Sequence, residues 1–340
     1  MKSTNPLPRF SEVFSTLSGT LPPFAIGVIA WQIGRIFPVL GAPVVAILIG
    51  LAAGQLLGQR KGWSAGIKFA SKFILQASIV LLGAGLSLAQ VAKIGGAGLP
   101  VMIGTLALCV AGGHFFGRAL QVEREVRTLV TYGTAICGAS AIATMSAVMG
   151  AASSTVAVSI TVIVIYNVLG AVLFPPIGHL LGLSQEAFGM WAGTAVNDTS
   201  SVMAAATAYG AAATSYAVVV KLTRTLAIIP LAVFQSWLQT RQPSATKGPV
   251  RSWYRLVPAF LVGFLIAAAM QSAGLIPHAW AHTLKLLAHF GITVAMGAVG
   301  MSSSLTAIRD AGWRPVALGG LLWITVATSS LLLQWVTGLL

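Results

Sequence analysis

Residues 193–218 read GTAVNDTSSVMAAATAYGAAATSYAV, and they align without gaps against residues 133–158, which read GTAICGASAIATMSAVMGAASSTVAV. Both stretches open on Gly-Thr-Ala, carry a serine at Ser140 or Ser200, and reach Gly-Ala-Ala at 150–152 or 210–212. Internal similarity of this kind is typical of membrane folds that are built from repeats. We therefore expect the fold to be organised around these two stretches.

The sequence around them is strongly apolar. Of its 340 residues, 56% are hydrophobic and 8% are charged, and the mean hydropathy is +0.89. An average soluble domain carries about 25% charged residues, and a helix that spans a bilayer needs about 20 mostly apolar residues. We therefore expect an all-α integral membrane protein.

Apolar runs bounded by charge, proline or glycine predict about eleven transmembrane helices. They lie near 21–40, 43–57, 70–89, 96–117, 128–150, 154–175, 187–208, 213–238, 254–272, 280–301 and 314–338. The polar N-terminal segment has no apolar core followed by a cleavage site, unlike a signal peptide. We expect residues 1–20 to form a cytoplasmic arm and residues 21–340 a single polytopic transporter domain, with core elements around 128–238.

Loop charges predict the orientation. With a cytoplasmic N-terminus, the opposite side holds only Lys93 and Lys285. The cytoplasmic segments hold Lys2, Arg9, Arg60, Lys61, Lys68, Lys72, Arg118, Arg124, Arg127, Arg241, Lys247, Arg251, Arg255, Arg309 and Arg314. This bias predicts a bacterial inner-membrane protein with a cytoplasmic N-terminus and a periplasmic C-terminus. It also explains the net charge of +14 without a nucleic-acid partner.

The repeats leave two interpretations open. A looser match pairs residues 83–101 with 299–316, and the predicted topology makes that pair antiparallel, as an inverted repeat requires. The same topology makes 133–158 and 193–218 parallel, which an inverted repeat does not allow. Either one of these segments is re-entrant, or their similarity reflects only a shared composition of small residues.

Asp198 is the only acidic residue predicted to lie inside a span. The other five, Glu12, Glu123, Glu125, Glu186 and Asp310, fall in the tail or in loops. Ionisable residues inside spans are rare and usually functional, and the neighbours of Asp198 are polar: Thr194, Asn197, Thr199 and Ser200. We expect these residues to form an ion or substrate site. The structural alternative is a carboxylate paired with a buried Lys or Arg.

The matching stretch offers Thr134, Cys137, Gly138 and Ser140, none of them ionised. Small residues pack helices closely in membranes, but a broken helix here would expose backbone N–H groups that suit an anion. Lys221 and Arg224, three residues apart, share one helix face and could supply positive charge. Snorkelling of these long side chains to the headgroups is the alternative.

No chemistry beyond transport is indicated. His278 and His282 have helical spacing but no third ligand nearby, so we expect no metal site. No catalytic signature is present, which argues against an enzyme and against an organic cofactor. The expected coupling ion is H⁺ or Na⁺.

Residues 133–142 and 193–206 resemble the two signature stretches of the YeiH-type sulfate exporter family, and residues 220–230 and 295–312 fit as well. The resemblance covers nearly the whole chain from about residue 20. It implies a transporter distantly similar to cation–proton antiporters and bile-acid sodium symporters. Such a fold is built from repeats and has two broken helices that cross near 134–140 and 194–201, where the substrate would bind.

One position departs from the family pattern. Members commonly have a histidine before the acidic residue, where this chain has Asn197, and asparagine cannot titrate. A histidine proton relay is therefore unavailable here, and Asp198 is the only candidate acid nearby. From the resemblance and the polar residues of the two stretches, we predict an alternating-access carrier of a small anion, such as sulfate or another sulfur oxyanion or sulfonate. Its partners would be the anion and the lipid bilayer, and a homodimer is open. The alternatives are a sodium/proton antiporter that uses Asp198 and a non-transporting membrane scaffold or sensor.

Overall fold

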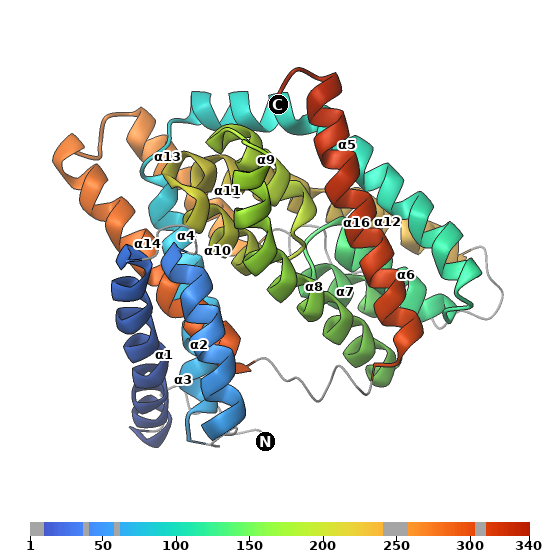
Figure 1. The fold of residues 1–340 in the computed structure, drawn as a ribbon, viewed down its shortest axis with the longest axis horizontal. Coiled ribbons are helices and arrows are strands. Elements are labelled where there is room, and N and C mark those ends of the chain that lie inside the picture. Colours follow the sequence, from blue (N-terminus) through green and yellow to red (C-terminus); the bar gives the residue numbers. More distant parts are fainter. Residues whose placement is uncertain (1–9, 37–40, 58–61, 241–257, 303–310) are drawn as a thin grey trace, which may run out of the picture.

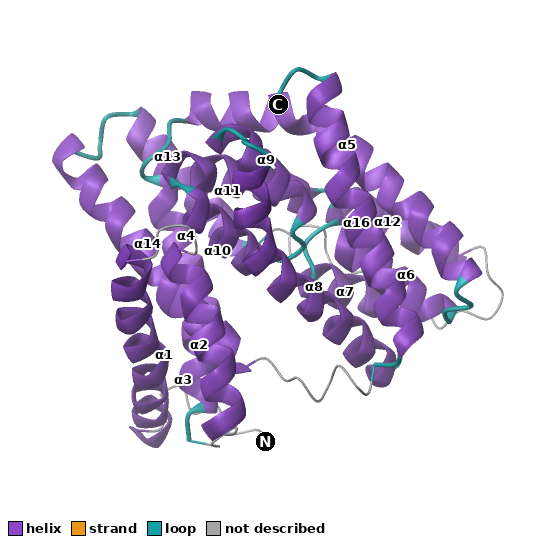
Figure 2. Cartoon of the chain, in the orientation of Figure 1, coloured by secondary structure: helices purple, strands orange, loops and turns teal. Residues whose placement is uncertain are grey.

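The computed structural model describes residues 10–36, 41–57, 62–240, 258–302 and 311–340. Within these ranges the regular structure is entirely helical (Figure 2). Large hydrophobic side chains face outward, among them Phe115 at 70% exposure and Ile103 at 62%. An exterior of this kind suits lipid rather than water. Asp310 and part of the looser repeat, 299–316, lie outside the described residues.

Six helical stretches in the described part are long and apolar enough to cross a membrane. They are α3–η1–α4 (Ser64–Phe69, Ala70–Ile74 and Leu75–Gly83), α5 (Leu88–Ala119), α8 (Ser153–Leu180), α11–α12 (Ala211–Leu226 and Ile228–Thr240), α14 (His278–Ser302) and α16 (Trp313–Val336). The other long helices are α1 (Phe10–Ile36), α2 (Gly41–Leu57) and α13 (Ala259–Ser272). The prediction of an all-helical, multi-pass membrane protein is confirmed.

Two of the eleven predicted spans, 128–150 and 187–208, are each interrupted by a connection of three residues. The first divides into α6 (Arg124–Ala135) and α7 (Ala139–Met149), and the second into α9 (Gln185–Ala195) and α10 (Thr199–Tyr209). The breaks fall where the sequence predicted them. Each break reverses the direction of the chain, however, so each pair is a re-entrant hairpin and not a broken helix that continues across.

The outer ends of the second hairpin lie together. The Tyr209 ring stacks on Phe188 with 3.7 Å between ring centroids, and its hydroxyl donates to the Leu183 carbonyl at 2.5 Å. The backbone N–H of Ala212 donates to the side chain of Gln185 at 2.9 Å. The end of α10 therefore lies beside the start of α9.

The first hairpin folds back in the same way. The Cβ position of Gly133 in α6 lies 3.0 Å from the side chain of Ile142 in α7. Nine residues along a continuous helix are about 13 Å apart, so this contact requires a reversal. In addition, α7 packs on α12, and Tyr132 of α6 donates to Gln235 of α12 at 3.3 Å.

The hairpins enter from opposite sides. Helix α8 has 28 residues, about 42 Å, and it joins the end of the first hairpin to the start of the second. Each hairpin begins and ends on the same side, and α8 runs from the base of one to the base of the other. The two bases therefore lie on opposite sides. We call the side where α5 ends and α6 begins the base side.

The remaining helices form two groups (Figure 1). Helices α1 to α4 pack with α13 and α14, whereas α5, α6, α8, α9, α11 and α16 pack with one another. Helix α10 contacts both groups, and Gly41 of α2 faces Ala208 of α10. The second hairpin thus lies at the boundary between the groups.

Candidate functional site

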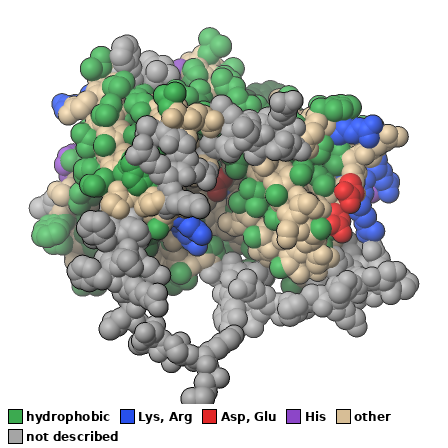
Figure 3. Space-filling model, turned by 90° about the horizontal axis from the view of Figure 1, so that it is seen from below, with side chains coloured by type: hydrophobic (Ala, Val, Ile, Leu, Met, Phe, Trp, Pro, Cys, Tyr) green, Lys and Arg blue, Asp and Glu red, His purple; other side chains and the backbone are tan. Residues whose placement is uncertain are grey.

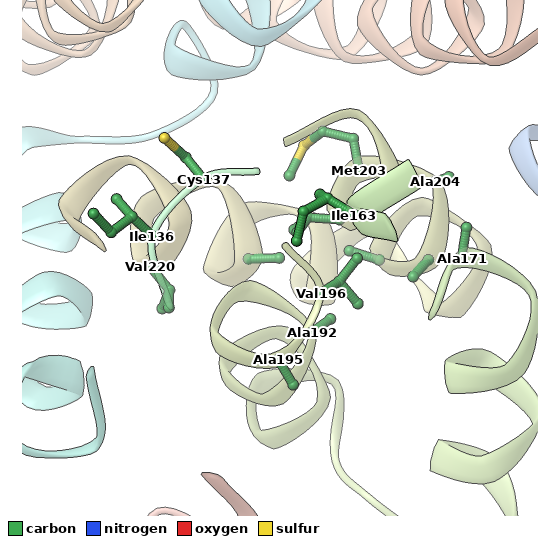
Figure 4. Packing of buried hydrophobic residues seen from close by; sticks show 14 of the residues in the cluster. Ile136, Cys137, Ile163, Ala171, Ala192, Ala195, Val196, Met203, Ala204 and Val220 are labelled. Atoms are coloured by element: carbon green, nitrogen blue, oxygen red, sulfur yellow. The ribbon is translucent and has the colours of Figure 1, made fainter. Parts of the chain in front are cut away.

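The tips of the two hairpins meet. Residues 136–138 join α6 to α7, and residues 196–198 join α9 to α10; Figure 4 shows Ile136 and Cys137 on one connection and Val196 on the other. Gly138 has φ +70° and ψ −128°, a conformation that residues with a Cβ rarely adopt. Its Cβ position lies 3.4 Å from the Cβ of Asp198. A glycine here permits both the turn and the close approach of the second tip.

One lysine binds both connections. The fully buried Lys221 of α11 donates from Nζ to the Ile136 carbonyl at 3.0 Å and to the Val196 carbonyl at 2.9 Å. Ile136 and Val196 occupy the same position in the two aligned stretches. The C-terminal end of a helix carries partial negative charge. The Lys221 ammonium group therefore stabilises the C-terminal ends of α6 and α9 at the same time.

Arg224 lies on the same face of α11 and acts similarly. Its Nε donates to the Ala135 carbonyl at 2.6 Å and its Nη2 to the Thr134 carbonyl at 3.4 Å. Neither Arg224 nor Lys221 belongs to the described wall of the cavity beside the tips. Both basic side chains are buried and bind carbonyls, so they do not snorkel, and the described residues show no ion pair between them and Asp198.

A cavity of about 720 Å³ lies beside the tips. Five of the residues predicted from sequence line it: Cys137, Ser140, Asp198, Thr199 and Ser200. The other six lie behind this wall among the described residues: Thr134, Gly138, Thr194, Asn197, Lys221 and Arg224. The cavity is thus bordered by the N-terminal ends of α7 and α10, while the C-terminal ends of α6 and α9 face the buried cations.

The two N-terminal ends differ. Asp198 caps α10: its Oδ2 accepts a hydrogen bond from the Ser200 N–H at 2.9 Å and another from the Ser200 hydroxyl. The Asp198 N–H in turn donates to Asn167 of α8 at 3.0 Å. At the aligned position α7 has Gly138, which provides no side-chain cap. The start of α7 therefore presents partial positive charge that no carboxylate caps.

Several polar groups behind the tips are buried and have no hydrogen-bond partner among the described residues. They are the Thr134 hydroxyl, both amide atoms of Asn197 and Nη1 of Arg224. Thr194, by contrast, is satisfied: its hydroxyl donates to the Met190 carbonyl at 2.8 Å and lies 2.6 Å from the hydroxyl of Ser330. Thr194, which the sequence predicted as a site residue, therefore uses its hydroxyl to join α9 to α16.

Part of the wall consists of residues that the sequence did not predict to be site residues. Asn167 and Thr161 of α8 line the cavity, as do Lys72 and Gln76. An isolated Asn in the apolar run 154–175 was the available signal for Asn167. Lys72 was assigned to a cytoplasmic segment because it stands at the edge of an apolar run, and its position in the cavity requires tertiary structure.

The cavity extends toward the base side. Ser302, the last residue of α14, is part of its wall, and Met301 beside it packs on Gly54 near the end of α2. Helix α2 ends where α3 begins, and α5 brings the chain back to that side after α3–η1–α4 has crossed. The wall of the cavity therefore reaches the side that carries the base of the first hairpin.

Comparison with known proteins places this architecture in a family. The family described as conserved hypothetical protein 698 matches residues 18–319. A UPF0324 membrane protein of Streptococcus pyogenes serotype M18 is 40% identical over 332 residues, covering 95% of this chain and 98% of that protein. One from Streptococcus agalactiae serotype V is 37% identical over 330 residues, covering 95% of this chain and 98% of that protein. The resemblance found in residues 133–142 and 193–206 is confirmed, and the chain belongs to this family of membrane proteins, the YeiH family.

Proposed function

We propose that this protein is a secondary transporter of a small anion that works by alternating access. The observation that carries the proposal is the uncapped N-terminal end of α7 at the wall of a membrane-embedded cavity. An anion there would meet first-turn N–H groups and the hydroxyl of Ser140. Ser200 and Thr199 border the same cavity from the second hairpin.

The arrangement of charge supports an anion. Four half-helices meet near the tips, and the two negative ends are bound by Lys221 and Arg224. One of the two positive ends is capped by Asp198, and the other carries no side-chain cap. By formal charge these groups are two cations and one carboxylate, and Lys72 also lines the cavity, so positive charge is in excess near the tips. That surplus favours a substrate with negative charge.

We further propose that 133–158 and 193–218 are an inverted repeat. Each stretch includes the end of one half-helix, a break, a second half-helix and the start of a long helix. The hairpins enter from opposite sides, so the interpretation with re-entrant segments removes the conflict with an inverted repeat. Lys221 binds the same aligned carbonyl in each.

Asp198 is the proposed coupling residue, which binds H⁺ or Na⁺ while the anion occupies the end of α7. In this proposal the base side is cytoplasmic, because Arg118, Arg124 and Arg127 lie there. The C-terminus is then periplasmic and the cavity is open to the cytoplasm. The proposed protein is not an enzyme, needs no metal or organic cofactor, and binds no nucleic acid.

Thermal unfolding of the purified protein tests the substrate class. Sulfate, sulfite and methanesulfonate would be titrated at several values of pH and sodium concentration. A ligand that binds only the folded state stabilises it by RT ln(1 + [L]/Kd), about 2.7 kcal/mol at 100 times Kd. We expect one of these anions to stabilise the wild type, and Asp198→Asn to change the dependence of that effect on pH or sodium.

Glu186→Gln is the matched control, since Glu186 lies in the first turn of α9 and outside the described wall of the cavity. It should respond like the wild type. If no anion stabilises the wild type while sodium or pH alone does, the anion proposal is wrong. The sodium/proton antiporter then becomes the better interpretation, favoured by Asp198 as the carboxylate that lines the described part of the cavity.

A third outcome would favour a scaffold or sensor. In that case neither anions nor sodium would stabilise the protein, and reconstituted vesicles would show no flux of either. Asp198→Asn would then change only the stability of the fold.

A further inference from the structure

A second pocket lies apart from the hairpin tips, at the foot of the first hairpin. It has a volume of about 520 Å³ and lies between the last turns of α5, α6 from Arg124 to Tyr132, and Gln235 of α12. Arg118, Arg124 and Arg127 line it together with His114. Figure 3 shows basic side chains, with acidic ones beside them, at the edge where Figure 1 places the end of α5 and the start of α6.

The packing directs these side chains toward the pocket. Arg127 lies over Gly117 of α5, where no side chain blocks its methylene groups. The hydroxyl of Thr131 donates to the Arg127 carbonyl at 2.7 Å and lies against Gly113. Two glycines of α5 thus let α6 approach closely, and the arginine head group extends past the contact.

No acidic side chain in the described lining of the pocket neutralises the positive charge of its arginines. Glu123 and Glu125 stand next to Arg124 in sequence, yet neither belongs to the described lining. Within the described residues, no hydrogen bond or ion pair engages the guanidinium of Arg118 or Arg127. Arg124 has an interaction of its own. Like charges repel at close range, so Arg118 and Arg127 at one pocket favour an anion between them.

The upper wall of the pocket adds neutral donors and acceptors. Thr128, Thr131 and Tyr132 line it above the arginines, and Tyr132 donates to Gln235 at 3.3 Å. A planar guanidinium presents several donors in a fork that matches a tetrahedral oxyanion. Basic pockets between helices at the membrane surface bind phosphate-bearing head groups.

We propose that this pocket is a binding site for a phosphate-type oxyanion, supplied by the head group of an anionic lipid or by a free ion. The site is separate from the transport site at the hairpin tips. It would hold the foot of α6, the helix whose other end is bound by Lys221 and Arg224. An anion in the pocket would therefore stabilise the first hairpin from its base.

Thermal unfolding of the detergent-solubilised full chain distinguishes the two sources. The probes are dioctanoyl phosphatidylglycerol and inorganic phosphate. We expect at least one probe to raise the melting temperature of the wild type in a saturable manner. A response to the lipid alone assigns a head-group site, and a response to inorganic phosphate assigns a site for a free oxyanion.

The variants are Arg118→Gln with Arg127→Gln, and Arg118→Glu alone. Each lost charge-assisted contact should raise the apparent Kd of the probe by about tenfold. Arg118 is exposed at the end of α5, so Arg118→Glu should fold even if the double variant does not. Arg314→Gln is the matched control, because Arg314 lies at the start of α16 and outside the described lining.

Asp198→Asn should leave the response to both probes unchanged, which separates this site from the transport site. The proposal is wrong if neither probe stabilises the wild type. It is equally wrong if Arg118→Glu responds to the probes as the wild type and the control Arg314→Gln do.

Discussion

At the scale of single residues, Lys221 is the side chain on which both hairpins depend. A charged group in a membrane interior is costly and persists only when it is well bound. Here two hydrogen bonds to carbonyls and the partial charges of two helix ends offset that cost. The residue is thus better described as a positioning group than as a direct ligand of the anion.

Replacement of Lys221 should be far more damaging than replacement of an exposed lysine. Lys221→Met leaves the Ile136 and Val196 carbonyls without a partner, and each buried group then costs about 1–3 kcal/mol. We expect a clear fall in melting temperature and loss of anion flux in vesicles. Lys285→Met, at an exposed position on α14, should leave both unchanged. Equal melting temperatures for the two variants would contradict the bridging role.

Asp198 combines a cap with a charge, and two substitutions separate them. Asn can still accept a hydrogen bond at an N-cap, whereas Ala cannot and costs about 1 kcal/mol. We expect Asp198→Ala to unfold at a lower temperature than Asp198→Asn. Both should lose the dependence of anion uptake on pH or sodium. If Asp198→Asn keeps that dependence, Asp198 is a structural cap and the coupling residue lies elsewhere.

At the scale of elements, the breaks in the hairpins follow from local sequence. Gly138 supplies a conformation with positive φ at one tip, and Asp198 supplies an N-cap at the other. Short runs of Ala, Ser and Thr then continue as half-helices that pack closely. A half-helix of 11 residues, such as α7 or α10, is about 16 Å long and reaches only part of the way across a bilayer.

A methyl group at Gly138 should disturb the tip through its backbone conformation. Gly138→Ala forces φ near +70° on a residue with a Cβ, at a cost of about 1–3 kcal/mol. We expect a lower melting temperature and weaker stabilisation by the anion. Gly96→Ala is the control, because Gly96 is helical and exposed and its Cβ position meets nothing within 4 Å. That change should be neutral or slightly stabilising.

The sequence predicted the positions of the breaks, and it left a re-entrant segment as one of two open interpretations. Composition and the aligned Gly-Thr-Ala openings located both tips, and the isolated carboxylate located Asp198. The direction of the chain after a break depends on contacts between distant residues, such as Gly133 with Ile142 and Tyr209 with Leu183. Hydropathy measures only how apolar a run is, so two short helices in a hairpin look like one span.

The same limit explains the placement of the cations. The three-residue spacing of Lys221 and Arg224 correctly put them on one helix face. Whether that face would meet the cavity or the helix ends depended on how α9 packs against α11, which the sequence does not encode locally. Asn167 was missed for a similar reason, since one Asn in an apolar helix gives no hint of its partner.

At the scale of the whole molecule, the cavity lies between two groups of helices. Its wall includes Asp198 and Ser200 from the second hairpin, Asn167 from α8, and Lys72 and Ser302 from the other group. A movement of one group against the other would change which side the tips face, as alternating access requires. The structure described here would be one end state of that cycle.

Cysteine labelling from each side of the membrane tests this state directly. Ser140 is exposed within the cavity, so Ser140→Cys in a Cys137→Ala background should react with a small, membrane-impermeant thiol reagent from the base side. Cys109 is fully buried and should stay unreactive. Ala211→Cys, exposed at the start of α11 beside the base of the second hairpin, is the control and should react only from the opposite side.

Labelling in the presence of the transported anion tests both binding and alternation. If it binds at the start of α7, it should slow the labelling of Ser140→Cys and leave that of Ala211→Cys unchanged, because only the first lies at the proposed site. If the carrier also alternates, a fraction of Ser140→Cys should become reactive from the opposite side when the anion is present. Reactivity from the base side alone, unaffected by any anion, would leave a cavity without transport and would favour the scaffold over the carrier.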